Sequence, residues 1–208
     1  MPVFVVPMLI AYPLIVHLGV RFDKPAWAVG YLALLLTLPA AIRLGRRRAP
    51  GWSAIVLSLL AILLLAVASS NAGLVLRLQP PLIFGLLCGL FSATLAPGSV
   101  PLISRFAILM TRDTPPPVLR YCRRATLAWA VFFLLMMLAS LGIGLFASLE
   151  TWSWFSNGIS YALIGVMFLV EFAVRRQVLQ PYVDYSFIQF IRNLRRVDFR
   201  RVLELRVP

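Results

Sequence analysis

Acid–base chemistry in this sequence would depend on a few titratable side chains, and Glu171 is the first of them. It lies inside a long apolar segment, and Arg175 follows it four residues later. Ionisable groups within apolar helices of this kind are costly and are functional candidates by default. A Glu and an Arg at this spacing also form an ordinary ion pair on one helix face. We therefore keep two interpretations of Glu171, a structural or interfacial ion pair with Arg175 and a functional carboxylate.

The single histidine, His17, raises the question of base catalysis. Lipid acyltransferases place an Asp after a His with four residues between them, so that the carboxylate orients the imidazole as the base. Five residues separate His17 from Asp23 in this chain, so the spacing departs from that pattern. We expect His17 to make an interfacial hydrogen bond instead.

Other catalytic and cofactor chemistry has little support in the residue pattern. One histidine and two distant cysteines do not make a usual transition-metal site. We find no glycine loop that would hold a phosphate and no GxSxG motif around a nucleophile. The sequence therefore predicts no catalytic residue, no metal and no cofactor, and it argues against an enzyme without deciding the question.

The composition predicts that these side chains are positioned by helices that cross a membrane. The 208 residues are 61% hydrophobic and 13% charged, whereas about a quarter of a soluble domain is charged. The apolar residues form long uninterrupted runs, and about 20 such residues cross the hydrocarbon core as a helix. Backbone groups in lipid must pair within their own segment, which favours helices. The predicted fold is an all-α, polytopic transmembrane helix bundle.

We predict about six spans within a transmembrane domain at residues 1–176. The spans are 2–20, 26–42, 52–68, 78–95, 125–147 and 157–174. A polar, proline-containing stretch at 69–81 interrupts the pattern between the third and fourth spans, and it is either a short loop or a re-entrant segment. Residues 177–208 are predicted to form a basic cytoplasmic tail, in which apolar residues at helical spacing among arginines indicate an amphipathic helix.

The distribution of positive charge predicts the orientation of these spans. All but three of the 20 Lys and Arg residues fall in alternate connections and in the tail. The exceptions are Arg21, Lys24 and Arg77. Because Lys and Arg concentrate in cytoplasmic loops, the pattern predicts that both termini are cytoplasmic. Tyr121, Arg123 and Arg124 then lie at the cytoplasmic foot of the fifth span.

On the predicted outer side, aromatic residues precede the sixth span, and Asn157, Gly158 and Tyr161 follow them. Asn157 is expected to open the sixth helix together with Gly158, and Tyr161 lies three residues further on. Helix capping and anchoring at the membrane interface are our interpretation of these residues. A polar cavity around Asn157 and Tyr161 is the alternative.

Three segments of the chain resemble a known family. They are YPLIVHLG at 12–19, YCRRATLAWAVFF at 121–133 and SNGISYALIGVMFLVEFAVRR at 156–176. The family comprises predicted inner-membrane proteins associated with gene clusters for aryl-polyene and xanthomonadin-type pigments, which also encode fatty-acid-synthase-like enzymes and acyl carrier proteins. Met136 and Met137 stand where the family pattern leads us to expect Asn-Gly. The resemblance implies a bacterial inner-membrane location and a pathway context, but it transfers no catalytic residue.

We expect an integral membrane accessory protein of aryl-polyene or lipid-like biosynthesis, which docks soluble enzymes or acyl carrier protein at the inner leaflet. Acyl carrier proteins are acidic, and the predicted cytoplasmic face is basic. The alternative is that the arginines only set topology and bind anionic lipid headgroups. Two further hypotheses are a transporter of a lipid or polyene intermediate and an intramembrane lipid-modifying transferase. Topology already explains the net charge of +13, so we expect no nucleic-acid partner, while small-residue spacings permit a homo-oligomer.

Overall fold

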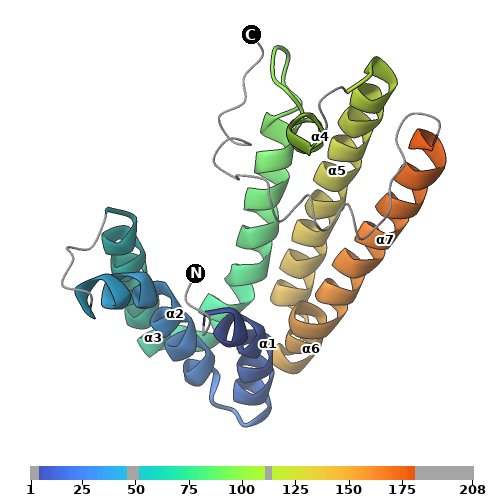
Figure 1. Ribbon diagram of the computed structural model, residues 1–208. Coiled ribbons are helices and arrows are strands. Elements are labelled where there is room, and N and C mark those ends of the chain that lie inside the picture. The colour runs from blue at the N-terminus through green and yellow to red at the C-terminus, as the bar shows by residue number, and fades with distance from the viewer. Residues whose placement is uncertain (1–4, 46–51, 111–113, 181–208) are drawn as a thin grey trace. The chain divides into compact units, whose positions relative to one another are not determined.

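The computed structural model describes residues 5–45, 52–110 and 114–180, and the secondary structure of these residues is all helical, with no strand. The first helices are α1 (Val5–Arg21), α2 (Pro25–Gly45) and α3 (Trp52–Ala93). A short α4 (Leu102–Met110) precedes the long α5 (Pro116–Phe146). The last stretch consists of α6 (Leu149–Trp154), a π-helical turn η1 (Phe155–Ile159) and α7 (Ser160–Leu179) (Figure 1). The predicted all-α fold is confirmed.

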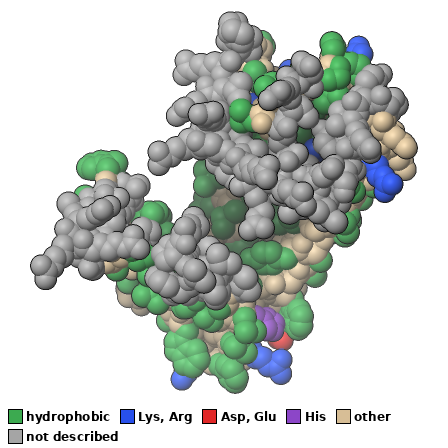
Figure 2. Space-filling model, viewed as in Figure 1, with side chains coloured by type: hydrophobic (Ala, Val, Ile, Leu, Met, Phe, Trp, Pro, Cys, Tyr) green, Lys and Arg blue, Asp and Glu red, His purple; other side chains and the backbone are tan. Residues whose placement is uncertain are grey.

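Three helical stretches are long and apolar enough to cross a membrane. They are Ile55–Ala93, Pro116–Phe146 and Leu149–Leu179, and Pro25–Leu38 is a shorter apolar helix. Large apolar side chains such as Leu86 and Leu145 lie exposed along these stretches, and hydrophobic side chains cover most of the described surface seen in Figure 2. Soluble monomers rarely expose apolar surface on this scale. The three helices therefore suggest a membrane protein.

The predicted third and fourth spans, 52–68 and 78–95, correspond to two helical segments that meet at a kink at Asn71 within α3. Residues 69–81 are helical apart from Asn71, so the interruption is a kink at one residue and not the predicted loop or re-entrant segment. Asn71 has non-helical backbone angles (φ −155°, ψ 80°). Its side-chain Oδ1 accepts a hydrogen bond of 2.9 Å from the backbone N–H of Leu74, as a helix-capping residue does. The polar cluster ends one helical segment and begins the next without forming a loop.

The last two spans also differ from the predicted ranges 125–147 and 157–174. α5 begins at Pro116, where the missing N–H of proline costs no helical hydrogen bond. Its first turns therefore include residues that we placed before the span. The final helical stretch begins at Leu149, and Ser148 Oγ accepts a hydrogen bond of 3.2 Å from the backbone N–H of Thr151. Asn157 lies inside η1, so its predicted capping role is wrong.

Some predictions concern residues outside the described ranges. The amphipathic helix predicted for the tail falls within 181–208, beyond the end of α7 at Leu179. The start of the first span and the arginines at 46–48 and 112 also lie outside these ranges. These expectations stay predictions.

The described helices divide into two compact units, each with its own core. Unit 1 is drawn from residues 1–82 and 138–162, and unit 2 from residues 83–137 and 163–208. The core of unit 1 consists of Val16, Ala28, Val29, Val75, Leu76 and Trp152. In unit 2, α4, α5 and the end of α7 pack around Ala107, Val118, Cys122 and Leu179. The candidate residues fall into two groups accordingly, with His17, Asn157 and Tyr161 in unit 1 and the others in unit 2.

Candidate functional site at the start of α5 and the end of α7

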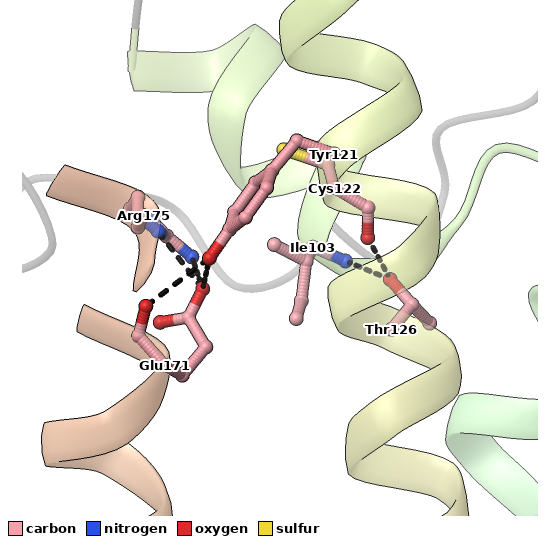
Figure 3. A network of polar contacts seen from close by, with 6 residues as sticks. All are labelled: Ile103, Tyr121, Cys122, Thr126, Glu171 and Arg175. Atoms are coloured by element: carbon pink, nitrogen blue, oxygen red, sulfur yellow. Dashed lines mark hydrogen bonds and ion pairs between the residues drawn. The ribbon is translucent and has the colours of Figure 1, made fainter. Parts of the chain in front are cut away.

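A hydrogen-bonded network in unit 2 joins Tyr121 of α5 to Glu171 and Arg175 of α7 (Figure 3). Arg175 donates from Nε and Nη2 to Glu171 Oε1, at 2.9 and 2.7 Å. The Tyr121 hydroxyl donates to the same Oε1 at 3.2 Å and lies 3.1 Å from the main-chain oxygen of Glu171. The contact predicted from the spacing of Glu171 and Arg175 is confirmed. The Tyr121 contact adds a second helix to it.

The burial of this network makes it more sensitive to the loss of one partner than a surface ion pair would be. The Arg175 and Glu171 side chains are 12% and 11% exposed. An exposed pair contributes only about 0–1 kcal/mol, whereas removing one partner of a buried pair costs about 3–5 kcal/mol because the other charge stays buried. The carboxylate charge of Glu171 is therefore already matched within the protein.

Two threonine hydroxyls bind the start of α4, that of Thr126 in α5 and that of Thr94, the residue that follows α3. Thr126 donates to the main-chain oxygen of Cys122 at 2.8 Å and accepts from the backbone N–H of Ile103 at 3.2 Å (Figure 3). Thr94 Oγ1 accepts from the backbone N–H of Leu102 at 3.0 Å. The first N–H groups of a helix lack partners within it, and these side chains supply them at the start of α4. These hydrogen bonds fix the start of α4 beside α5.

A cavity of about 620 Å³ lies between the first half of α5 and the second half of α7, within unit 2. Its lining follows helical spacing on both elements. From α5 come Pro117, Arg120, Tyr121, Arg124, Ala125 and Ala128; from α7 come Met167, Val170, Glu171, Val174 and Val178. Apart from the network above, the lining is apolar with two arginines. An amphiphile would match such a surface.

The two arginines of the cavity differ from their neighbour Arg123. Arg120 and Arg124 are exposed, and neither has a hydrogen-bond or ion-pair partner among the described residues. Arg123 instead donates from Nη2 to the main-chain oxygen of Leu95 at 3.2 Å, where it holds the chain just after α3. Of the residues predicted at the foot of this span, Tyr121 and Arg124 line the cavity and Arg123 does not.

Arg120 was absent from the predicted site, although its spacing carries a usable signal. Pro117, Tyr121 and Arg124 follow one another at intervals of three or four residues, and Arg120 falls on the same helical face. Arg120 lies outside the predicted span at 125–147, and the prediction uses it only as one of the cytoplasmic charges. α5 begins at Pro116, so Arg120 belongs to this helix and lies on the face that lines the cavity.

The second group of predicted residues lies in unit 1. His17 Nδ1 is 3.2 Å from Ser153 Oγ, and the imidazole ring meets the ring of Trp154 edge-on at 4.8 Å between centroids. Asn157 Nδ2 donates to Ser153 at both its main-chain oxygen (3.1 Å) and its Oγ (3.3 Å). His17 therefore makes a hydrogen bond, as expected, and its partner is Ser153. Tyr161 is 54% exposed.

The described residues contain no group of three or more His, Cys, Asp or Glu side chains that could hold a metal ion. Cys88 and Cys122 are free thiols, and Cys122 is buried in the core of unit 2.

The α5–α7 cavity combines the positive charges of Arg120 and Arg124 with an apolar lining, and its one carboxylate, Glu171, is paired with Arg175. That chemistry suits binding of an anion with an apolar chain.

Comparisons with protein-family models, with curated proteins and with solved structures gave no match to this chain.

Proposed function

We propose that the chain crosses the membrane six times, with both termini in the cytoplasm. Asn71 divides α3 into helical segments at 52–70 and 72–93, and each exceeds the roughly 17 residues that a spanning helix needs. α1 and α2, with 17 and 21 residues, are long enough to supply the first two spans. The uneven distribution of Lys and Arg supports the orientation.

Labelling of single cysteines tests this topology. In a variant without Cys88 and Cys122, we expect Asp23→Cys and Glu150→Cys to react with a membrane-impermeant maleimide added to intact cells. Gln180→Cys should react only after lysis, because it follows the last span on the cytoplasmic side. All three native positions are exposed. The reverse labelling pattern would contradict the orientation, and labelling at Glu150→Cys without labelling at Asp23→Cys would contradict the six-span count.

We propose further that the protein is a membrane-embedded accessory protein that holds an anionic, acyl-chain-bearing intermediate at the cytoplasmic leaflet. The observation that carries this proposal is the α5–α7 cavity, with Arg120 and Arg124 beside an otherwise largely apolar lining. Its volume of about 620 Å³ is within the range of about 300–1,000 Å³ for small-molecule sites. The resemblance to the aryl-polyene family suggests the pathway, in which a fatty-acid-like intermediate is the ligand.

The arginines, rather than the apolar lining, would decide which amphiphiles bind. An acyl chain in the bilayer is already surrounded by hydrocarbon, so its transfer into the cavity gains little hydrophobic free energy. A hydrogen bond to a charged group contributes about 1.5–3 kcal/mol. Arg120 and Arg124 can each make such bonds to a phosphate or carboxylate. The head of the ligand therefore supplies most of the selectivity.

Native mass spectrometry of the full chain in detergent tests the proposed binding. We expect retention of an anionic lipid over a zwitterionic lipid with the same acyl chains. The double variant Arg120→Gln, Arg124→Gln should lower this retention at least tenfold, because it removes the charged donors. Arg176→Gln is the matched control, since Arg176 is an exposed arginine of α7 outside the cavity lining. Equal retention of the two lipids would contradict the proposal.

The same exposed arginines favour a second candidate, the docking of acyl carrier protein or of an acidic soluble enzyme. Complementary charge mainly raises the rate and selectivity of association, and salt screens it. Docking would be favoured by carrier protein that co-purifies with the full chain and is lost at moderate salt or in Arg120→Glu, Arg124→Glu. If the same preparation showed no preference for anionic lipid, docking would replace lipid binding as the function.

A further inference from the structure

The charges that line the α5–α7 cavity indicate how much negative charge its ligand carries. The charged and titratable side chains that line it, among the described residues, are Arg120, Tyr121, Arg124 and Glu171. Glu171 is bound by Arg175 at 2.7 and 2.9 Å and by the Tyr121 hydroxyl at 3.2 Å. Its negative charge is thus balanced within the protein. Two positive charges remain without a counter-charge in the described part of the site.

The positions of these two charges destabilise α5 when no anion is bound beside them. Arg120 and Arg124 are separated by one helical turn, and like charges at this spacing destabilise a helix by a few tenths of a kcal/mol. Arg120 also lies just after the first turn of α5, near the end where the helix dipole is positive. An anion between the two guanidinium groups would relieve both effects. A ligand with two negative charges would do so more completely than one with a single charge.

We propose that the cavity preferentially binds a membrane lipid with a phosphomonoester head, as in phosphatidic acid. A phosphomonoester carries a charge of about −1.5 to −2 at pH 7 and presents three strong acceptor oxygens, whereas a phosphodiester carries a single charge. Planar guanidinium groups bind such oxygens through paired N–H donors. The inference rests on the proposed function, because it names the headgroup for the same cavity.

The lining favours a lipid over free phosphate as the occupant. Beyond the arginines, the cavity continues along Ala125 and Ala128 of α5 and along Met167 and Val170 of α7. These side chains offer no hydrogen-bond partner to a small inorganic anion, but they can accompany an acyl chain. Exposed apolar side chains follow on both helices, such as Leu127 and Leu169. The chain of a bound lipid can therefore remain in contact with the surrounding bilayer.

Competition between lipids with identical acyl chains tests the inference on the full chain in detergent. At pH 7.5, native mass spectrometry should show phosphatidic acid retained about tenfold over phosphatidylglycerol, a phosphodiester. The preference should disappear in Arg120→Gln, Arg124→Gln and persist in Arg176→Gln. Arg120→Lys, Arg124→Lys keeps the charge but not the paired donors, so we expect an intermediate preference. Inorganic phosphate at millimolar concentration should not displace the lipid.

The pH dependence provides a readout that a structural role of the arginines would not give. The second pKa of a phosphomonoester is about 6, and arginine stays charged throughout this range. Lowering the pH from 7.5 to 5 should therefore bring the retention of phosphatidic acid close to that of phosphatidylglycerol. Phosphatidylglycerol measured at both pH values is the control for any effect of pH on the protein itself.

The outcomes separate this inference from the proposed function. Equal retention of both anionic lipids at pH 7.5, with loss of both in Arg120→Gln, Arg124→Gln, would overturn phosphomonoester preference and leave anionic-lipid binding in place. Displacement by inorganic phosphate would overturn the lipid as occupant. Absence of retention for every anionic lipid would overturn both proposals.

Discussion

Replacing Arg175 with leucine is expected to lower the free energy of unfolding by about 3 kcal/mol. The substitution leaves the Glu171 carboxylate nearly buried, at 11% exposure, without the two N–H donors that reach it at 2.7 and 2.9 Å. Breaking a buried pair costs about 3–5 kcal/mol, and the lower end applies because Tyr121 still donates to the carboxylate. Denaturant titration of the protein in detergent measures the change.

The double variant Glu171→Leu, Arg175→Leu distinguishes a lost attraction from a stranded charge. Replacing a whole buried ion pair with apolar residues is often neutral or stabilising, so we expect the double variant to recover most of the lost stability. Arg176→Leu serves as the control, because this neighbouring arginine is exposed and its substitution should change stability by less than about 0.5 kcal/mol. A double variant as unstable as Arg175→Leu would show that the site requires the ions themselves.

Local spacing was enough to predict one contact of this site and not the other. Glu171 and Arg175 lie four residues apart, so any helix through them brings the side chains together. Tyr121 and Glu171 are 50 residues apart in the sequence, and residue spacing within a helix cannot predict a contact between residues so far apart. Tyr121 was chosen because it falls at the foot of a predicted span among arginines. Its partner follows only from the way α5 and α7 pack.

The error at 69–81 has a different physical cause. Ser69, Ser70, Asn71 and the prolines that follow are residues that favour turns, and their cluster predicted a connection. In the structure the serine hydroxyls donate to main-chain oxygens three residues earlier, at 2.6 and 2.9 Å. Within α3, Asn71 is the residue with non-helical backbone angles. Polar side chains that bond to their own helix are compatible with its continuation. Composition located the break correctly but overestimated its length.

Arg77 shows how the same expectation hid a tertiary contact. Within an assumed loop it counted only as a charge on the outer side. In α3 its Nη1 donates to the main-chain oxygens of Gly144 and Ala147, the latter at 3.1 Å. The last carbonyl groups of a helix have no partner within it, and a cation near that end also matches the helix dipole. Arg77 therefore caps α5, within unit 1.

Removing this cap is expected to be the second large effect. Arg77→Met keeps the aliphatic stem and removes the guanidinium, and we expect a loss of about 2–3 kcal/mol, since hydrogen bonds to charged groups contribute about 1.5–3 kcal/mol each and water replaces part of the loss. Arg77→Lys should lose about half as much, because a single ammonium group cannot hold both acceptors as well as guanidinium does. The same denaturant titration in detergent measures both variants.

Two comparisons decide whether capping is the cause. Arg21→Met removes an exposed arginine of the same unit, at the end of α1, and should change stability by less than about 0.5 kcal/mol. A Cβ at Gly144 would lie 3.5 Å from the main-chain oxygen of Arg77 and 3.8 Å from its Cβ, which is ordinary van der Waals contact, so Gly144→Ala should preserve the cap. A loss in Gly144→Ala as large as in Arg77→Met would mean that close packing of α3 against α5, rather than the guanidinium, stabilises this end of the helix.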